Sequence, residues 1–102
     1  MTFGLSETTI EKIKSVFRQH PEIEEVIIYG SRAKGNFREG SDIDFTMKGA
    51  YLTSAIRSKV AIQIDELNTP YLFDISIFNQ INNRDLEKHI QNYGKTFYKR
   101  LD

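Results

Sequence analysis

Apolar and polar residues follow two different periods along this chain, and each period predicts its own kind of element. Spacings of three and four residues are typical of a helix with one buried side, and they predict helices over residues 6–20, 51–68 and 82–93. Alternation and short β-branched runs are typical of strands, and they predict strands over residues 25–29, 43–47 and 71–78. We also expect a short helix from residue 31 to residue 34, and a final strand or an extended tail at residues 96–98.

The order of these elements predicts the fold class. Helices and strands intermix along the chain, so we expect an α/β (α+β) domain. Its sheet should be mixed, with three or four strands and with helices packed mainly on one face. The 102 residues suit one small domain, spanning residues 1–102.

The first helix carries residues that favour helix termini. Thr8 and Glu11 match a capping box, and Ser6 is an alternative N-cap. Pro21 ends the helix directly after His20. We interpret His20 as a surface residue near the negative end of the helix dipole rather than as a catalytic group.

Two carboxylates flank an apolar residue in the second predicted strand. Alternation places Asp42 and Asp44 on one face, and Ile43 and Phe45 on the other. Two carboxylates held this close repel each other, and a divalent cation removes the repulsion. Hard oxygen ligands are the ones that Mg²⁺ prefers, so the pattern predicts a metal-binding strand.

A Gly-Ser pair separates the first predicted strand from a basic segment. Gly30 permits a sharp turn and a close approach of the backbone to a ligand, and amide groups at a helix start bind phosphate. An ordinary strand-to-helix turn is the alternative, but the two downstream carboxylates favour a phosphate site after Gly30 and Ser31. Arg32 and Lys34 would add positive charge, whereas Arg38 either reaches a triphosphate or is solvated.

The third predicted strand carries one acidic residue among apolar ones. Alternation places Asp74 on the face opposite to Phe73 and Ile75. A buried acid requires a partner or a metal, while an edge strand would leave Asp74 in water. The pattern of this strand leaves both alternatives open. In the last predicted helix, His89 lies one residue off the apolar stripe, and we interpret it as a surface residue.

The segment GSRAKGNFREGSDIDF, residues 30–45, has Gly-Ser followed after ten residues by Asp-x-Asp. It resembles the signature of the polymerase-β-type nucleotidyltransferase superfamily, and in particular the minimal nucleotidyltransferases (MNT), the MntA-like antitoxins of HEPN/MNT pairs. The ending HIQNYGKTFYKR is also similar to the ends of these proteins, so the resemblance runs from about Ile10 to Arg100. It implies the nucleotidyltransferase palm fold and a third carboxylate on a strand beside the Asp-x-Asp strand, the position that Asp74 matches.

The resemblance also implies a reaction and its site residues. A nucleoside monophosphate, expected to be AMP, is transferred from an NTP, expected to be ATP, to a hydroxyl group with release of pyrophosphate. Two Mg²⁺ ions would be held by three carboxylates, those of Asp42, Asp44 and Asp74, and Asp74 would help to deprotonate the acceptor. The β- and γ-phosphates would be bound at the Gly-Ser turn, with the nucleotide-binding residues Gly30, Ser31, Arg32 and Lys34.

The composition excludes several other classes of protein. The net charge is zero with 14 basic and 14 acidic residues, which argues against a dedicated nucleic-acid binder. The absence of cysteine excludes disulfides and thiolate metal sites. No apolar run reaches the length of a membrane span, and the first residues lack the pattern of a secretory signal. We therefore expect a cytoplasmic protein.

A palm domain alone offers an open site, so we expect the acceptor to belong to another protein. The resemblance points to a tyrosine on a HEPN-type helical toxin, with this chain as the antitoxin. Two alternatives remain: a non-catalytic binding module that masks its partner by contact, and a nucleotidyltransferase that modifies a small molecule. The exposed helix faces suit a homo-oligomer equally well, and the sequence does not give the base preference or the number of nucleotides transferred.

Overall fold

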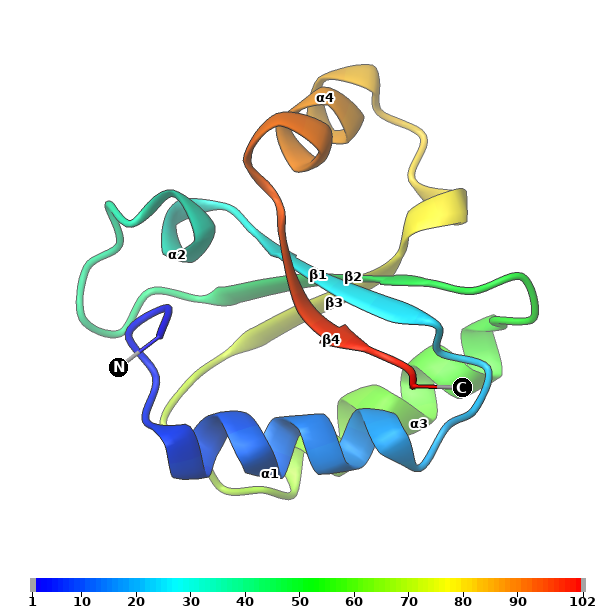
Figure 1. The fold of residues 1–102 in the computed structure, drawn as a ribbon, viewed down its shortest axis with the longest axis horizontal. Helices are drawn as coiled ribbons and strands as arrows, with labels where there is room; N and C mark the ends of the chain where they lie inside the picture. The colour runs from blue at the N-terminus through cyan, green and yellow to red at the C-terminus, as the bar shows by residue number, and fades with distance from the viewer. Residues whose placement is uncertain (1, 102) are drawn as a thin grey trace.

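A four-stranded mixed sheet forms the centre of the molecule (Figure 1). The computed structural model describes residues 2–101, and the sheet has the order β3-β2-β1-β4. The strands are β1 (Glu25–Tyr29), β2 (Ile43–Lys48), β3 (Phe73–Ile77) and β4 (Lys95–Lys99). Strand β1 pairs antiparallel with β2 and β4, whereas β2 and β3 are parallel. The predicted mixed sheet is confirmed, and the last segment is a strand rather than a tail.

The helices are α1 (Glu7–Arg18), α2 (Ser31–Lys34), α3 (Ser54–Asp65) and α4 (Arg84–Tyr93), with a 3₁₀ turn η1 (Phe78–Gln80). Helix α3 begins three residues later than its predicted start because the side chain of Thr53 caps it, accepting a hydrogen bond from the Ile56 amide at 3.2 Å. Helix α1 begins after Ser6, whose hydroxyl accepts from the Thr9 amide at 3.1 Å. The alternative cap is therefore correct, and Thr8 is not the cap.

The hydrophobic core lies between the sheet and the two long helices, α1 and α3, which cover the same face (Figure 1). Phe17 of α1 packs edge-on against Phe45 of β2, with ring centroids 5.5 Å apart. Alternation along β2 buries Ile43 and Phe45 completely against these helices. Asp44, which lies between them, consequently points to the opposite face of the sheet. Helix α4 lies over that face (Figure 1).

His20 is buried, which contradicts its prediction as a surface residue. Its Nε2 lies 2.6 Å from Oε1 of Gln63 in α3. Helix α3 packs against the end of α1 and covers the imidazole, a contact between segments far apart in the sequence. Within residues 2–101, no helix combines the length and the apolar character needed to cross a membrane.

Candidate active site

Two of the three predicted carboxylates lie directly opposite each other. The parallel pairing of β2 and β3 makes Asp44 and Asp74 register partners, and neighbouring strands are about 5 Å apart. Asp42 directly precedes β2 on the same face as Asp44 and is exposed to solvent. Asp74 is also exposed and belongs to an edge strand. Of the two alternatives for Asp74, the structure shows the solvated edge strand, and this strand lies beside the Asp-x-Asp strand as the resemblance implied.

The electrostatics of this face are those of crowded acids. Partial burial raises the pKa of Asp44, and the negative charges of Asp74 and Asp42 raise that pKa further. His89 has the opposite, smaller effect on the pKa of Asp44. Like charges disfavour ionisation of each other, so the fold holds these carboxylates together at a cost in free energy.

The donor set fits a hard divalent cation. Carboxylate oxygens are the ligands of Mg²⁺, and a cation would relieve the repulsion at Asp44. Among the residues that the structure describes, however, no three acidic, histidine or cysteine side chains already converge into a metal-binding cluster. Asp42 and Asp74 are exposed side chains that are free to rotate toward a cation.

Tyr29 lies beside the carboxylates at the end of β1, as the register partner of Asp44. Burial raises the pKa of its phenol, and the charges of Asp74 and Asp44 add to this effect, while a hydrogen bond with Ser76 opposes it. The Ser76 hydroxyl donates to Oγ1 of Thr46 at 2.9 Å. The hydroxyl groups of Ser76 and Thr46 are therefore on the same face of the sheet as Asp74 and Asp44.

Gly30 adjoins Asp44 and must be glycine for two reasons. Its φ of 76° and ψ of −156° belong to a region that is essentially restricted to glycine. A Cβ atom at Gly30 would also overlap with the carboxylate of Asp44. The predicted strand-to-helix turn is confirmed, since helix α2 begins at Ser31 and the Gly30 carbonyl accepts from the Lys34 amide at 3.1 Å.

His89 contacts this turn, which corrects its interpretation as a surface residue. The Gly30 amide donates a hydrogen bond to Nε2 of His89 at 3.1 Å. The half-buried imidazole lies between two rings, edge-on to Tyr29 at 6.2 Å and tilted against Tyr93 at 5.3 Å. The spacing of residues 89 and 93 places them on one side of the helix, but it does not show that this side packs on the Gly30 turn.

Arg32 is bonded to backbone carbonyl groups, and its contact with phosphate stays a prediction. Its Nε and Nη2 donate to the Ser41 carbonyl at 3.0 and 2.9 Å, and its Nη1 donates to the Phe3 carbonyl at 2.9 Å. The buried guanidinium also lies 4.9 Å from each of the ring centroids of Phe37 and Tyr71. Arg32 therefore joins the N-terminal segment to the loop before β2.

Lys34 remains a candidate for a contact with phosphate. It is exposed, and its Nζ lies 4.9 Å from the centroid of the Tyr93 ring, on the α4 side of the turn. The side chain of Arg38 is exposed, while the Arg38 amide donates to the Ser41 hydroxyl at 2.9 Å. Lys34 is the last residue of α2, and its side chain reaches α4 at Tyr93.

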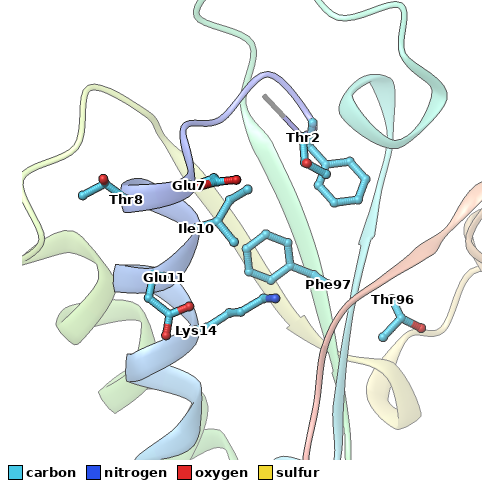
Figure 2. A pocket seen from close by; sticks show the side chains of 9 residues that line it. Thr2, Glu7, Thr8, Ile10, Glu11, Lys14, Thr96 and Phe97 are labelled. Carbon is cyan, nitrogen blue, oxygen red and sulfur yellow. The ribbon is translucent and has the colours of Figure 1, made fainter.

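Two surface hollows lie away from the carboxylates. One, of about 670 Å³, lies between the N-terminal segment, α1 and β4, where Ile10, Lys14 and Phe97 line it (Figure 2). The other, of about 870 Å³, lies beside α2 and is lined in part by Arg32 and Lys34. Neither of these two hollows is lined by Asp42, Asp44 or Asp74.

Paired acids on adjacent strands, next to a glycine turn that begins a helix, define a palm domain of the nucleotidyltransferase type. Comparison with protein families supports this class directly. Residues 11–102 match the family described as "Polymerase beta, Nucleotidyltransferase". The chain therefore belongs to the polymerase-β nucleotidyltransferase family, as the resemblance of residues 30–45 implied. No curated protein matches the chain in sequence.

Solved structures with the same fold include several toxin–antitoxin complexes. A toxin–antitoxin with AMP-PNP has a TM-score of 0.71 and 21% identity, covering 94% of this chain and 75% of that chain. A complex of an MNT antitoxin with a tri-AMPylated HEPN toxin from Shewanella oneidensis has a TM-score of 0.69 and 17% identity, covering 94% of this chain and 74% of that chain. The toxin–antitoxin MntA-HepT has a TM-score of 0.69 and 18% identity, covering 93% of this chain and 74% of that chain. At these identities the comparisons establish a shared fold.

Proposed function

We propose that this chain is a Mg²⁺-dependent nucleotidyltransferase that transfers AMP from ATP to a hydroxyl group, most specifically a tyrosine, of a HEPN-type helical partner. The observation that carries the proposal is the register of Asp44 and Asp74 beside Gly30. Two structural neighbours support the nucleotide and the partner, since one was solved with AMP-PNP and another contains an AMPylated HEPN toxin. In this proposal the chain is the antitoxin, and it acts in the cytoplasm.

The acidic residues have separate tasks in the proposed reaction. Asp42, Asp44 and Asp74 would hold two Mg²⁺ ions, which supply charge neutralisation at the phosphates when bound. The acceptor oxygen attacks the α-phosphorus, the bond from that phosphorus to the bridging oxygen breaks, and pyrophosphate leaves. Asp74 takes the proton of the acceptor hydroxyl. Its exposure on an edge strand suits this role, because an acceptor on a second protein can reach it.

The Gly-Ser turn and Lys34 orient the triphosphate. Phosphoryl transfer depends mainly on positioning and on electrostatic stabilisation. Gly30 brings the turn next to Asp44 without a side chain in the way, and Ser31 offers an amide and a hydroxyl group to the phosphates. Lys34 contributes charge from the first turn after Gly30. Arg32 holds the loop that precedes β2, and so acts on the position of Asp42 indirectly.

The test is transfer of label from ATP carrying ³²P at the α-phosphate, with γ-labelled ATP as the control, in lysate of the native host with Mg²⁺. Purified wild-type chain and the Asp42→Asn/Asp44→Asn double variant are added in parallel. A protein band that takes up α-label but not γ-label, with wild type alone, supports the proposal and identifies the acceptor.

The same assay separates the two alternatives. A labelled small molecule in place of a protein band would indicate a small-molecule nucleotidyltransferase. No label in any fraction, together with co-purification of a helical partner, would indicate the non-catalytic binding module. The matched control is Asp65→Asn, an exposed acid at the end of α3 that should transfer label like wild type.

A further inference from the structure

Helix α4 contacts the backbone of the Gly30–Ser31 turn through the side chain of His89. The Gly30 amide and Nε2 of His89 form a hydrogen bond of 3.1 Å between residues 59 positions apart. The Gly30 amide is the donor and Nε2 the acceptor, so the bond uses the lone pair of this ring nitrogen. The rings of Tyr29 and Tyr93 pack against the same imidazole and fix its orientation.

Inside the turn the Gly30 carbonyl accepts from the Lys34 amide, whereas the Gly30 amide has its partner in α4. Gly30 has no side chain that could cap α2, and its backbone conformation is one that glycine leaves readily in a flexible chain. Helix α2 has four residues, too few to be stable by itself. A hydrogen bond from a longer helix is thus a direct way to hold Gly30 against Asp44.

We propose that His89 is a positioning residue of the nucleotide site, which fixes the Gly30–Ser31 turn through the Gly30 amide. The role rests on the proposed nucleotidyltransferase function. It has a specific consequence for phosphate binding. The Gly30 amide is already engaged by His89, so Ser31 is the member of the pair whose amide and hydroxyl bind phosphate.

Three substitutions separate the hydrogen bond from the bulk of the side chain. His89→Gln places an amide oxygen at about the reach of Nε2, His89→Asn places one at about the reach of Nδ1, and His89→Ala removes both. His20→Gln is the matched control, since His20 contacts Gln63 in the core between α1 and α3. Thermal unfolding of each variant verifies that it is folded before the other measurements.

The first measurement is hydrogen exchange of the Gly30 amide by NMR, without nucleotide. We expect exchange at least about tenfold faster in His89→Ala and His89→Asn than in wild type, because a hydrogen bond of ordinary strength is lost. His89→Gln and His20→Gln should exchange like wild type. Unchanged exchange in folded His89→Ala would overturn the proposal at its first step.

The second measurement is binding of AMP-PNP and the kinetics of label transfer. We expect KM for ATP to rise about tenfold in the Ala and Asn variants, with a much smaller change in kcat, and to return to near wild type in the Gln variant. Equal losses in all three folded variants would overturn the positioning role. If wild type neither binds AMP-PNP nor transfers label, the proposed function fails and this role with it, whereas the exchange data still decide the hydrogen bond.

Discussion

Asp44 and Asp74 are register partners on two parallel strands, with their carboxylates on the face opposite to the hydrophobic core. The pairing places an acid of the Asp-x-Asp motif next to an acid from a distant part of the chain. Mutual repulsion makes the arrangement unfavourable for stability alone. Each of the following experiments tests one part of the proposed site.

Substitution of Asp74 should separate activity from stability. We expect Asp74→Asn to lower label transfer by at least about 100-fold, because it removes a group that stabilises the transition state. The free energy of unfolding should change by less than about 0.5 kcal/mol, since the side chain is exposed. Label-transfer rates and urea unfolding check the two effects, and Asp85→Asn on α4 is the exposed control. Retained transfer would remove Asp74 from the site.

The stability of the protein should depend on pH through Asp44. Its pKa in the fold is raised above the ordinary value of 3.8, so the folded state disfavours the ionised form. The contribution of Asp44 to stability is therefore most favourable below this ordinary value and is lost as pH rises through the raised pKa. Asp44→Asn should remove this slope and stabilise the protein at pH 7 by less than about 1 kcal/mol, because the carboxyl is only partly buried. Urea unfolding at a series of pH values checks the slope, and parallel curves for the two proteins would contradict it.

Addition and removal of Mg²⁺ should change the unfolding temperature of wild type. A ligand at one hundred times its dissociation constant stabilises a fold by about 2.7 kcal/mol. We expect this stabilisation to vanish on chelation with EDTA and to be absent in the Asp42→Asn/Asp44→Asn variant. Calorimetry measures it directly, with the Asp65→Asn variant as the control that responds like wild type. Equal stabilisation of wild type and the double variant would show that the cation binds elsewhere.

Substitution of Gly30 should be far more harmful than that of another glycine with positive φ. Gly30→Ala combines a backbone conformation reserved for glycine with overlap against the Asp44 carboxylate. We expect a loss of at least about 2 kcal/mol in stability and of all measurable transfer. Gly35→Ala, at φ 86° with open space around its Cβ position, should cost about 1 kcal/mol and keep activity. Equal effects on activity would contradict the close approach of Gly30 to Asp44.

Arg32 and Lys34 should give opposite phenotypes although both are basic residues of α2. Arg32→Lys should lower stability by about 2–4 kcal/mol, because a lysine cannot reproduce the three hydrogen bonds to two carbonyl groups. Lys34→Ala should change stability by less than about 1 kcal/mol and weaken ATP binding. Chemical unfolding and AMP-PNP titration separate the two. A stable Arg32→Lys variant with weak nucleotide binding would support the phosphate role of Arg32.

The strands and the acidic motif could be predicted because they depend on local pattern. Alternation along residues 42–45 determines which side chains of β2 face the core. Strands β1 and β2 pair with each other, and both bury apolar side chains in the same hydrophobic core. The position of Asp74 does not follow from local pattern, since its own strand is compatible with solvent or with a metal. The register with Asp44 depends on how β3 docks, and that is a property of the whole fold.

The surface interpretations of His20 and His89 were wrong, and the carbonyl partners of Arg32 could not be predicted, for a shared physical reason. Each is held by a partner far away in the sequence: Phe3 and Ser41 for Arg32, Gln63 for His20, and Gly30 for His89. Charged and polar residues are mostly exposed, so a local pattern assigns them to the surface. Only the packing of distant elements supplies the partners that make their burial favourable.

The parallel pairing of β2 and β3 has a consequence for the order in which the molecule is made. Parallel neighbours cannot be joined by a tight turn, and the chain passes through α3 before it returns as β3. During synthesis, a chain that ends near residue 70 contains the Asp-x-Asp strand but lacks its acidic counterpart. Contacts between distant segments also form late, after the intervening loop has closed. A partly synthesised chain of this length therefore carries Asp44 without Asp74, and the acidic pair forms only when β3 docks beside β2.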